Sequence, residues 1–102
     1  MSEIERPIIF GEVLYDCFPD GQAVLGGAPF NVAWHLQGFG LSPLFISRVG
    51  DDPLGRHVRD TMHRHGMNTS GFQMDSAHPT GKVNITLKGD HHSFEIIPDQ
   101  AY

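Results

Sequence analysis

The spacing of hydrophobic and polar positions changes several times along the chain, and each spacing predicts a different kind of element. Residues 7–14 begin as a continuous apolar run, which is typical of a strand buried on both faces of a parallel sheet. In residues 82–88 apolar and polar side chains alternate strictly, which predicts a strand with one covered face and one wet face. Apolar residues at helical spacing predict one helix over residues 29–37 and another from residue 53 to about 65.

Both predicted helices have recognisable ends. Pro29 suits the first turn of the first helix, and Gly38 can end it. Asp51 and Asp52 provide an N-cap signal for the second helix, which is expected to stop at Gly66. The faces expected to be buried consist of Val32, Ala33 and Leu36 in the first helix and of Leu54, Val58 and Met62 in the second.

The order of the predicted elements divides the chain into two parts. Strand, helix, strand and helix alternate over about residues 7–70, which predicts a right-handed parallel βαβ layer. After this layer the pattern changes to short strands, and residues 89–92 are expected as a hairpin loop. Strands within about 12–25 and 72–97 are expected to form a small second sheet. Further strands are predicted at residues 22–25, 44–49, 72–74 and 93–97.

Composition narrows the class of protein. The chain has 102 residues, of which 39% are hydrophobic and 19% charged, as in one small folded domain. The formal net charge of -5 and the scattered Lys and Arg residues argue against nucleic acid or an anionic membrane as a partner. The single cysteine, Cys17, allows no disulfide within the chain, and the polar N-terminus lacks a signal-peptide pattern. We therefore expect a cytoplasmic protein.

Candidate ligand-binding residues lie near the start of the first predicted helix and beyond the first predicted strand. Gly26 and Gly27 lack a Cβ, so a ligand can approach the backbone closely. The amide of Asn31 both donates and accepts hydrogen bonds. Asp16 follows the first strand, and ligands of open α/β sheets collect beyond the carboxyl ends of strands. From the residues alone, a ligand site and a plain strand-to-helix turn both remain open.

Metal binding is not expected. Asp51 and Asp52 suit a helix cap, and the pattern places no other acidic ligand near them. The sequence has seven histidines, but no pair has the helical i,i+4 spacing of a zinc site with a third ligand in view. We interpret the histidines as surface residues.

Several short motifs follow one another in a definite order. They are Gly11-Glu12-Val13-Leu14-Tyr15-Asp16, Gly26-Gly27-Ala28-Pro29-Phe30-Asn31-Val32-Ala33, Gly38, Gly40, Val49-Gly50-Asp51-Asp52 and Gly55. In this order they resemble the N-terminal part of the ribokinase/PfkB carbohydrate kinases, and in particular the fructokinase-like branch. The resemblance covers about residues 7–102 and implies that they correspond to roughly the first third of such an enzyme.

The resemblance implies a fold and a set of sugar-binding residues. The fold is α/β, with a ribokinase-like, Rossmann-type βαβ layer and a small β-sheet lid, of which residues 1–102 are the N-terminal portion only. Asp16 corresponds to the aspartate that accepts hydrogen bonds from sugar hydroxyls. Gly26, Gly27 and Asn31 correspond to further substrate-binding residues, and Phe94 is expected to pack against the sugar ring from the lid.

The resemblance also implies what lies elsewhere in such an enzyme. ATP and Mg²⁺ are implied for the full-length enzyme, but the family's later Gly-Ala-Gly-Asp motif is absent from this sequence. That motif combines an anion hole with the catalytic aspartate, and the nucleotide pocket follows it. We therefore expect no catalytic, cofactor-binding or metal-binding residue in this chain, which would be inactive alone.

Two functions remain open. The first is the sugar-binding and lid portion of an ATP-dependent kinase of fructose or a related ketose, with a nucleoside or 2-keto-3-deoxygluconate kinase as alternatives within the family. The second is a non-catalytic module that binds a sugar or dimerises through its lid. In either case, exposed strand edges and the β lid predict a homo-oligomer.

Overall fold

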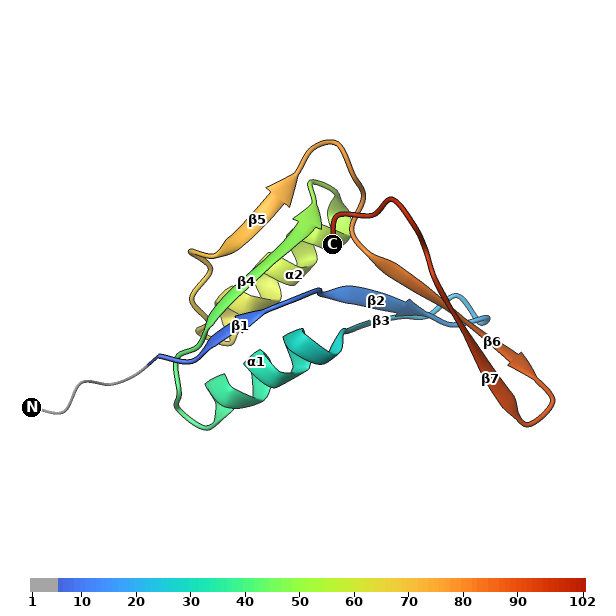
Figure 1. Ribbon diagram of the computed structural model, residues 1–102, viewed down its shortest axis with the longest axis horizontal. Helices are drawn as coiled ribbons and strands as arrows, with labels where there is room; N and C mark the ends of the chain where they lie inside the picture. The colour runs from blue at the N-terminus through green and yellow to red at the C-terminus, as the bar shows by residue number, and fades with distance from the viewer. Residues whose placement is uncertain (1–5) are drawn as a thin grey trace, which may run out of the picture.

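Two β-sheets form the frame of the molecule, and two helices pack against one of them (Figure 1). The computed structural model describes residues 6–102. Residues 1–5, whose polar character argues against a signal peptide, lie outside the described residues. The elements in chain order are β1 (Ile8–Phe10), β2 (Leu14–Cys17), β3 (Ala23–Gly26), α1 (Ala28–Gly38), β4 (Leu44–Gly50), α2 (Pro53–Arg64), β5 (Phe72–Asp75), β6 (Lys82–Lys88) and β7 (His91–Ile96).

We call the sheet with strand order β1-β4-β5 the core sheet and the sheet with order β3-β2-β6-β7 the lid sheet. All strand pairs of the core sheet are parallel. The lid sheet joins two antiparallel hairpins, β2–β3 and β6–β7, through the parallel pair of β2 and β6. Figure 1 shows the lid sheet projecting away from the core sheet and its helices. The predicted α/β layer with a small β lid is therefore confirmed.

The helices cover one face of the core sheet. Phe45 and Val49 of β4 point to this face, because side chains two apart on a strand share a face. Phe30 of α1 and Val58 and Met62 of α2 pack with them in one buried cluster. Burial of each such side chain stabilises the fold by about 1.5–3 kcal/mol relative to leaving it exposed.

The prediction of a single strand over residues 7–14 is wrong, because this segment contains the end of one strand and the start of another in a different sheet. β1 ends at Phe10, and the chain crosses at Gly11 before it enters β2 of the lid sheet at Leu14. This crossing passes close to α1, because a Cβ on Gly11 would lie 2.5 Å from Cγ of Pro29. Phe10 is 81% exposed, since within the described chain the core sheet has helices on one face only.

The strand predicted at residues 72–74 belongs to the core sheet and not to the lid. β5 pairs in parallel with β4, so that Phe72 lies opposite Ser47 and Met74 lies opposite Val49. Phe72 and Met74 pack against the buried cluster under the helices, and this packing selects the sheet. The α/β layer thus extends to residue 75, beyond the expected boundary near 70.

The helix predicted over residues 29–37 is α1, but its buried face differs from the prediction. Phe30 and Ala33 are buried, whereas Val32 is 49% exposed. Phe30 and Ala33 lie three residues apart, which places them on one helix face toward the core sheet. Phe30 packs edge-on against Phe45 of β4, with 5.8 Å between ring centroids. The aromatic residue therefore decides which face of α1 is buried.

The second predicted helix is α2, and both its cap and its buried face are confirmed. Asp52 is the N-cap residue, and its Oδ1 accepts a hydrogen bond of 2.8 Å from the Gly55 N–H. Val58 and Met62 are fully buried, and Leu54 packs against the same cluster. The local signals in this segment were therefore sufficient to define the helix.

The alternating pattern of residues 82–88 is confirmed in β6. Val83 and Ile85 are buried with Leu14 in a small cluster of their own, whereas Asn84 is exposed. The lid sheet is a single layer over most of its length, so β3, β6 and β7 expose apolar side chains as well. Those exposed side chains are Val24, Leu87, Phe94 and Ile96.

The hairpin loop predicted at residues 89–92 is shorter in the structure. β7 begins at His91, so that His91 and His92 belong to the strand and the turn consists of Gly89 and Asp90. Gly89 has φ of 59°, a conformation that suits the first central position of a tight hairpin turn. Among residues 6–102 there is no helix with the length and apolar character needed to cross a membrane.

Candidate functional site

Asp16 lies in the middle of β2, on one face of the lid sheet. Its direct neighbours across the two adjacent strands are Val24 and Val83. A Cβ built on Gly26 would lie 2.8 Å from Oδ2 of Asp16, so the carboxylate rests against the bare backbone of this glycine. The structure therefore brings Asp16 and Gly26 together, as the predicted site requires, in surroundings that are otherwise apolar.

Gly27 has a packing role that the sequence did not reveal. It adopts φ of 101° as the N-cap residue of α1, a conformation that favours glycine. A Cβ there would lie 3.0 Å from the backbone oxygen of Glu12 and 3.3 Å from Cα of Val13. The start of α1 thus packs directly against the chain that crosses from β1 to β2.

Asn31 lies in the first turn of α1 and is exposed. It lines a groove of about 240 Å³ together with Leu25, Phe30, Trp34 and Thr61. Leu25 pairs with the residue before Asp16, which puts this groove on the side of the lid sheet that Asp16 does not face. Within residues 6–102 no hydrogen bond joins Asn31 to Asp16, and the shared role of these two residues stays a prediction.

Phe94 lies in β7, opposite Ile85 of β6, and is 65% exposed. It is on the same face of the lid sheet as Asp16, because both side chains follow the register through β6. β7 is two strands away from β2, and Phe94 is displaced by two residues from Ile96, which is in line with Asp16, so about 12 Å separates the two residues. A ligand would have to span this distance to contact Asp16 and Phe94 together.

Tyr15 is a residue of the site region that the sequence reading missed. Its side chain points to the face opposite Asp16 and is only 3% exposed. Its hydroxyl lies 2.6 Å from Nδ1 of His57 and 3.3 Å from the backbone oxygen of Leu54. Burial, and then the negative charge of Asp52, raise the pKa of Tyr15 to about 12. This contact fastens the strand that carries Asp16 to the first turns of α2.

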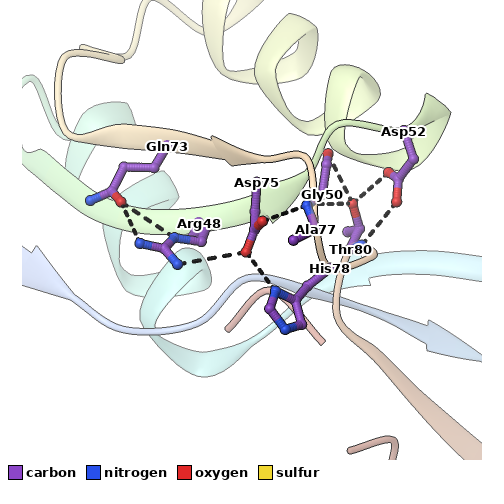
Figure 2. A network of polar contacts seen from close by, with 8 residues as sticks. All are labelled: Arg48, Gly50, Asp52, Gln73, Asp75, Ala77, His78 and Thr80. Carbon is purple, nitrogen blue, oxygen red and sulfur yellow. Dashed lines mark hydrogen bonds and ion pairs between the residues drawn. The ribbon is translucent and has the colours of Figure 1, made fainter. Parts of the chain in front are cut away.

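Asp52 and Thr80 form a second polar contact, which joins the start of α2 to the segment that leads into β6 (Figure 2). Besides capping α2, the Asp52 carboxylate accepts hydrogen bonds from the Thr80 hydroxyl at 2.6 Å and from the Thr80 N–H at 2.9 Å. Burial opposes the charged form of Asp52. The hydrogen bonds from Thr80 and Gly55 outweigh it and hold the pKa of this carboxyl below its usual value.

A further polar group lies at the carboxyl end of β4 and β5. Arg48 donates a hydrogen bond of 3.0 Å to Gln73, and its guanidinium lies 3.6 Å from Asp75 (Figure 2). Asp75 also accepts from the Ala77 N–H and pairs with His78. The bond from Ala77 is the main cause that lowers the pKa of Asp75, with His78 and Arg48 adding to it against some burial. This group orders the turn after β5.

No three His, Cys, Asp or Glu side chains converge as metal ligands would, as far as residues 6–102 are concerned. A groove of about 200 Å³ lies beside the carboxyl end of β1 and offers Arg48, Gln73 and Tyr102 as polar groups. The Tyr102 hydroxyl donates toward the backbone oxygens of Ile97 and Lys82, at 2.9 and 3.2 Å. Ile46, Arg48 and Gln73 of its lining lie within β4 and β5, so the groove runs over the face of the core sheet opposite the helices.

Comparison with known proteins places this arrangement in a family. Residues 12–101 match the pfkB family of carbohydrate kinases, and the chain belongs to this family. A fructokinase of Klebsiella pneumoniae is 37% identical over 83 residues, which are 78% of this chain and 27% of that protein. A putative sugar kinase of Pyrococcus horikoshii is 38% identical over 77 residues, which are 76% of this chain and 25% of that protein. The chain thus spans about a quarter of the length of these relatives.

Solved structures agree with the family assignment. The structure of an uncharacterized sugar kinase of Pyrococcus horikoshii in complex with ATP has a TM-score of 0.82 at 31% identity, over 93% of this chain and 35% of that one. A fructokinase of Vibrio cholerae O395 with fructose, ADP and calcium bound has a TM-score of 0.77 at 28% identity, over 96% of this chain and 34% of that one. The described fold is therefore the N-terminal portion of a ribokinase-like sugar kinase.

Proposed function

We propose that this chain is the sugar-binding and lid portion of an ATP-dependent carbohydrate kinase whose substrate is fructose or a related ketose. The observation that carries the proposal is the position of Asp16. Among the described strands of the lid sheet it is the only carboxylate on its face, because side chains alternate along each strand. Glu95 of β7 lies on the other face. The fructokinases among the relatives support the choice of sugar.

The chemistry of this face suits a neutral sugar. Asp16 can accept hydrogen bonds from two hydroxyl groups, while the half-exposed Val24 beside it offers apolar surface to the C–H groups of the ring. The lid sheet would cover the bound sugar and exclude water from it, which strengthens these hydrogen bonds. Phe94 would contact the sugar only if it reaches across the adjacent strand.

Phosphoryl transfer needs a bound nucleotide, stabilisation of the transferring group and an oriented hydroxyl. In our proposal this chain contributes to the last of these, since Asp16 holds and orients the sugar. ATP, Mg²⁺ and the catalytic base would be supplied by the part of the longer relatives that has no counterpart here. The 102 residues alone are therefore expected to bind a sugar without phosphorylating it.

A second candidate function is supported by the exposed apolar side chains of the lid sheet. Leu87, Phe94 and Ile96 are each more than half exposed on a sheet that forms a single layer. Such surfaces and free strand edges favour association with a second copy. We therefore expect a homo-oligomer formed through the lid sheet, and light scattering that shows only monomer at high concentration would contradict this.

Calorimetric titration of the 102-residue chain with fructose, ribose and 2-keto-3-deoxygluconate tests the first proposal. We expect fructose to bind, and Asp16→Ala to weaken binding by about 1–3 kcal/mol because the sugar loses a charged hydrogen-bond acceptor. Asp60→Ala removes an exposed carboxylate from α2 and serves as the control for charge. Asn31→Ala tests the second polar residue in the same way.

Each outcome of this titration has a distinct meaning. Equal affinity in the wild type, Asp16→Ala and Asn31→Ala would remove both residues from the site. Preferred binding of 2-keto-3-deoxygluconate or ribose would replace fructose by one of the alternatives within the family. No binding of any sugar by a chain that circular dichroism shows to be folded would contradict a preformed sugar site in these residues.

A further inference from the structure

Thr80 is a polar residue with no exposed surface, placed where the chain passes from the core sheet into the lid sheet. Its hydroxyl donates to Oδ1 of Asp52 at 2.6 Å and accepts from the Gly50 N–H at 3.0 Å. Its own N–H donates to Oδ2 of Asp52 at 2.9 Å. Figure 2 shows Thr80 between Gly50 at the end of β4 and Asp52 at the start of α2. Every hydrogen-bonding group of this side chain is therefore used inside the protein.

The space around Thr80 is closed on several sides. A Cβ on Gly50 would lie 2.5 Å from the Thr80 nitrogen, and one on Gly55 would lie 3.0 Å from Oγ1 of Thr80. The Gly55 position would also collide with the backbone oxygen of Gly50. The two glycines thus allow β4, α2 and the Thr80 segment to approach one another closely. Thr80 has little room to move without breaking its hydrogen bonds.

The position of Thr80 is passed on to the strand that carries Asp16. The next residue, Gly81, accepts a hydrogen bond of 2.9 Å from the Tyr15 N–H. Lys82 then pairs with Tyr15, and Val83 pairs with Asp16. The parallel seam between β2 and β6 therefore begins directly after Thr80, and Asp16 lies within its first pairs.

The contact of Tyr15 with α2 complements this arrangement. Tyr15 is hydrogen-bonded to His57 and Leu54, which lie five and two residues along the chain from Asp52. β2 and β6 are thus each attached to α2, one through a phenol and the other through a threonine. Asp16 follows Tyr15 in β2 and therefore points to the opposite face of the lid sheet.

We propose that Thr80 is a positioning residue, which with Asp52 fixes the β2–β6 seam and so holds Asp16 in place for the sugar. The part of this inference that concerns the sugar rests on the proposed function. The part that concerns the seam does not, because it can be measured without any ligand. A role in general stability alone would loosen the whole chain, whereas a positioning role loosens the seam selectively.

The test compares Thr80→Val, which removes the hydroxyl at nearly constant shape, with Thr80→Ser, which keeps it. Hydrogen exchange of backbone amides is measured in the 102-residue chain for residues 15–17 and 82–84 of the seam and for residues 45–49 of the core sheet. We expect roughly tenfold faster exchange in the seam of Thr80→Val and less than about twofold change in the core sheet. Thr80→Ser should restore slow exchange, and fructose affinity should fall only in Thr80→Val.

Several results would overturn the proposal. These are unchanged exchange in the seam of Thr80→Val, equal acceleration in seam and core sheet, and failure of Thr80→Ser to restore the seam. If Thr80→Val does not fold, Asp52→Asn replaces it, since an amide offers an acceptor to only one of the two Thr80 donors. The expected exchange in the seam and in the core sheet is then the same for Asp52→Asn, and unchanged exchange in the seam or equal acceleration in both regions would contradict the proposal.

The two proposals fail in different ways. If the seam loosens but no variant, including the wild type, binds fructose, the proposed sugar function fails and the control of the seam by Thr80 stands. If the wild type binds fructose and Thr80→Val loosens the seam without losing affinity, the positioning role of Thr80 fails and the sugar function stands.

Discussion

The core sheet and the lid sheet differ in how they bury their apolar side chains. The core sheet packs against two helices, and the larger buried cluster within residues 6–102 has nine members. The lid sheet has a buried cluster of only three, Leu14, Val83 and Ile85. Its outer strand β7 is exposed along its whole length. A single layer of sheet rarely buries enough surface to be stable alone.

This difference shows that the lid sheet depends on attachments to the rest of the molecule. Tyr15 and Thr80 provide two of them, and both end on α2. Tyr15 is also a member of the larger buried cluster, although it belongs to a lid strand. The lid sheet is therefore stable near α2 and has little support toward Leu87 and Phe94.

The largest effect is expected from Phe45→Ala in the core sheet. Phe45 is fully buried and packs against Phe30, so the truncation should cost about 3–5 kcal/mol of unfolding free energy. Urea titration followed by circular dichroism and by the fluorescence of Trp34 measures this loss. Ile85→Ala in the lid cluster is the matched comparison, and we expect about 2–3 kcal/mol because neighbouring strands can partly close the gap. An equal loss of unfolding free energy in the two variants would contradict the difference in packing between the core sheet and the lid sheet.

A smaller effect is expected at the attachment between the two regions. The pKa of Tyr15 is raised to about 12, above its ordinary value of 10.0, so the protonated phenol is favoured by folding. Its contribution to stability is fully present below pH 10 and is lost as the pH rises toward 12. We expect the unfolding free energy of the wild type to fall over this range.

Tyr15→Phe should reduce that fall and should cost about 1 kcal/mol at neutral pH, where the hydrogen bond to α2 is lost. Chemical unfolding at a series of pH values between 9 and 12 measures both effects. Burial also raises the pKa of Tyr102, so Tyr102→Phe is the control and should leave most of the fall in place. If Tyr15→Phe follows the wild-type curve, Tyr15 is not the attachment.

The smallest effect on stability is expected at the free end of the lid sheet. Phe94→Ala should change the unfolding free energy by less than about 0.5 kcal/mol, because this side chain is mostly exposed. The same substitution should weaken self-association in light scattering if the lid sheet forms the contact between copies. A loss of more than about 1 kcal/mol would contradict this and show that other side chains pack against Phe94.

The sequence predicted the elements that are defined by neighbours along the chain. The Asp52 cap of α2 and the alternation of Val83 and Ile85 are such local signals, and both are confirmed. The choice of sheet for β5 depends on pairing with β4, which no local pattern records. The break at Gly11 depends in the same way on its close approach to α1.

In the candidate site, too, the sequence predicted local features and missed contacts between distant residues. The motifs predicted Asp16 and Gly26 as one site, and the structure brings them together. Asn31 makes no hydrogen bond to Asp16 within residues 6–102, and its role stays a prediction. Tyr15 and Thr80 were missed because their partners on α2 lie far away in the sequence. No spacing rule connects a buried phenol or hydroxyl to such a partner.

The parallel seam between β2 and β6 has a consequence for the time course of folding. Each hairpin of the lid sheet joins strands that are close in sequence, but the seam joins Tyr15 to Lys82. Closing so long a loop costs entropy that local hairpins do not have to overcome. During synthesis on the ribosome, β2 and β3 are therefore made first, and β2 cannot pair with β6 until β6 has emerged. β2, which carries Asp16, therefore pairs with its second neighbouring strand only after residues 82–88 have been translated.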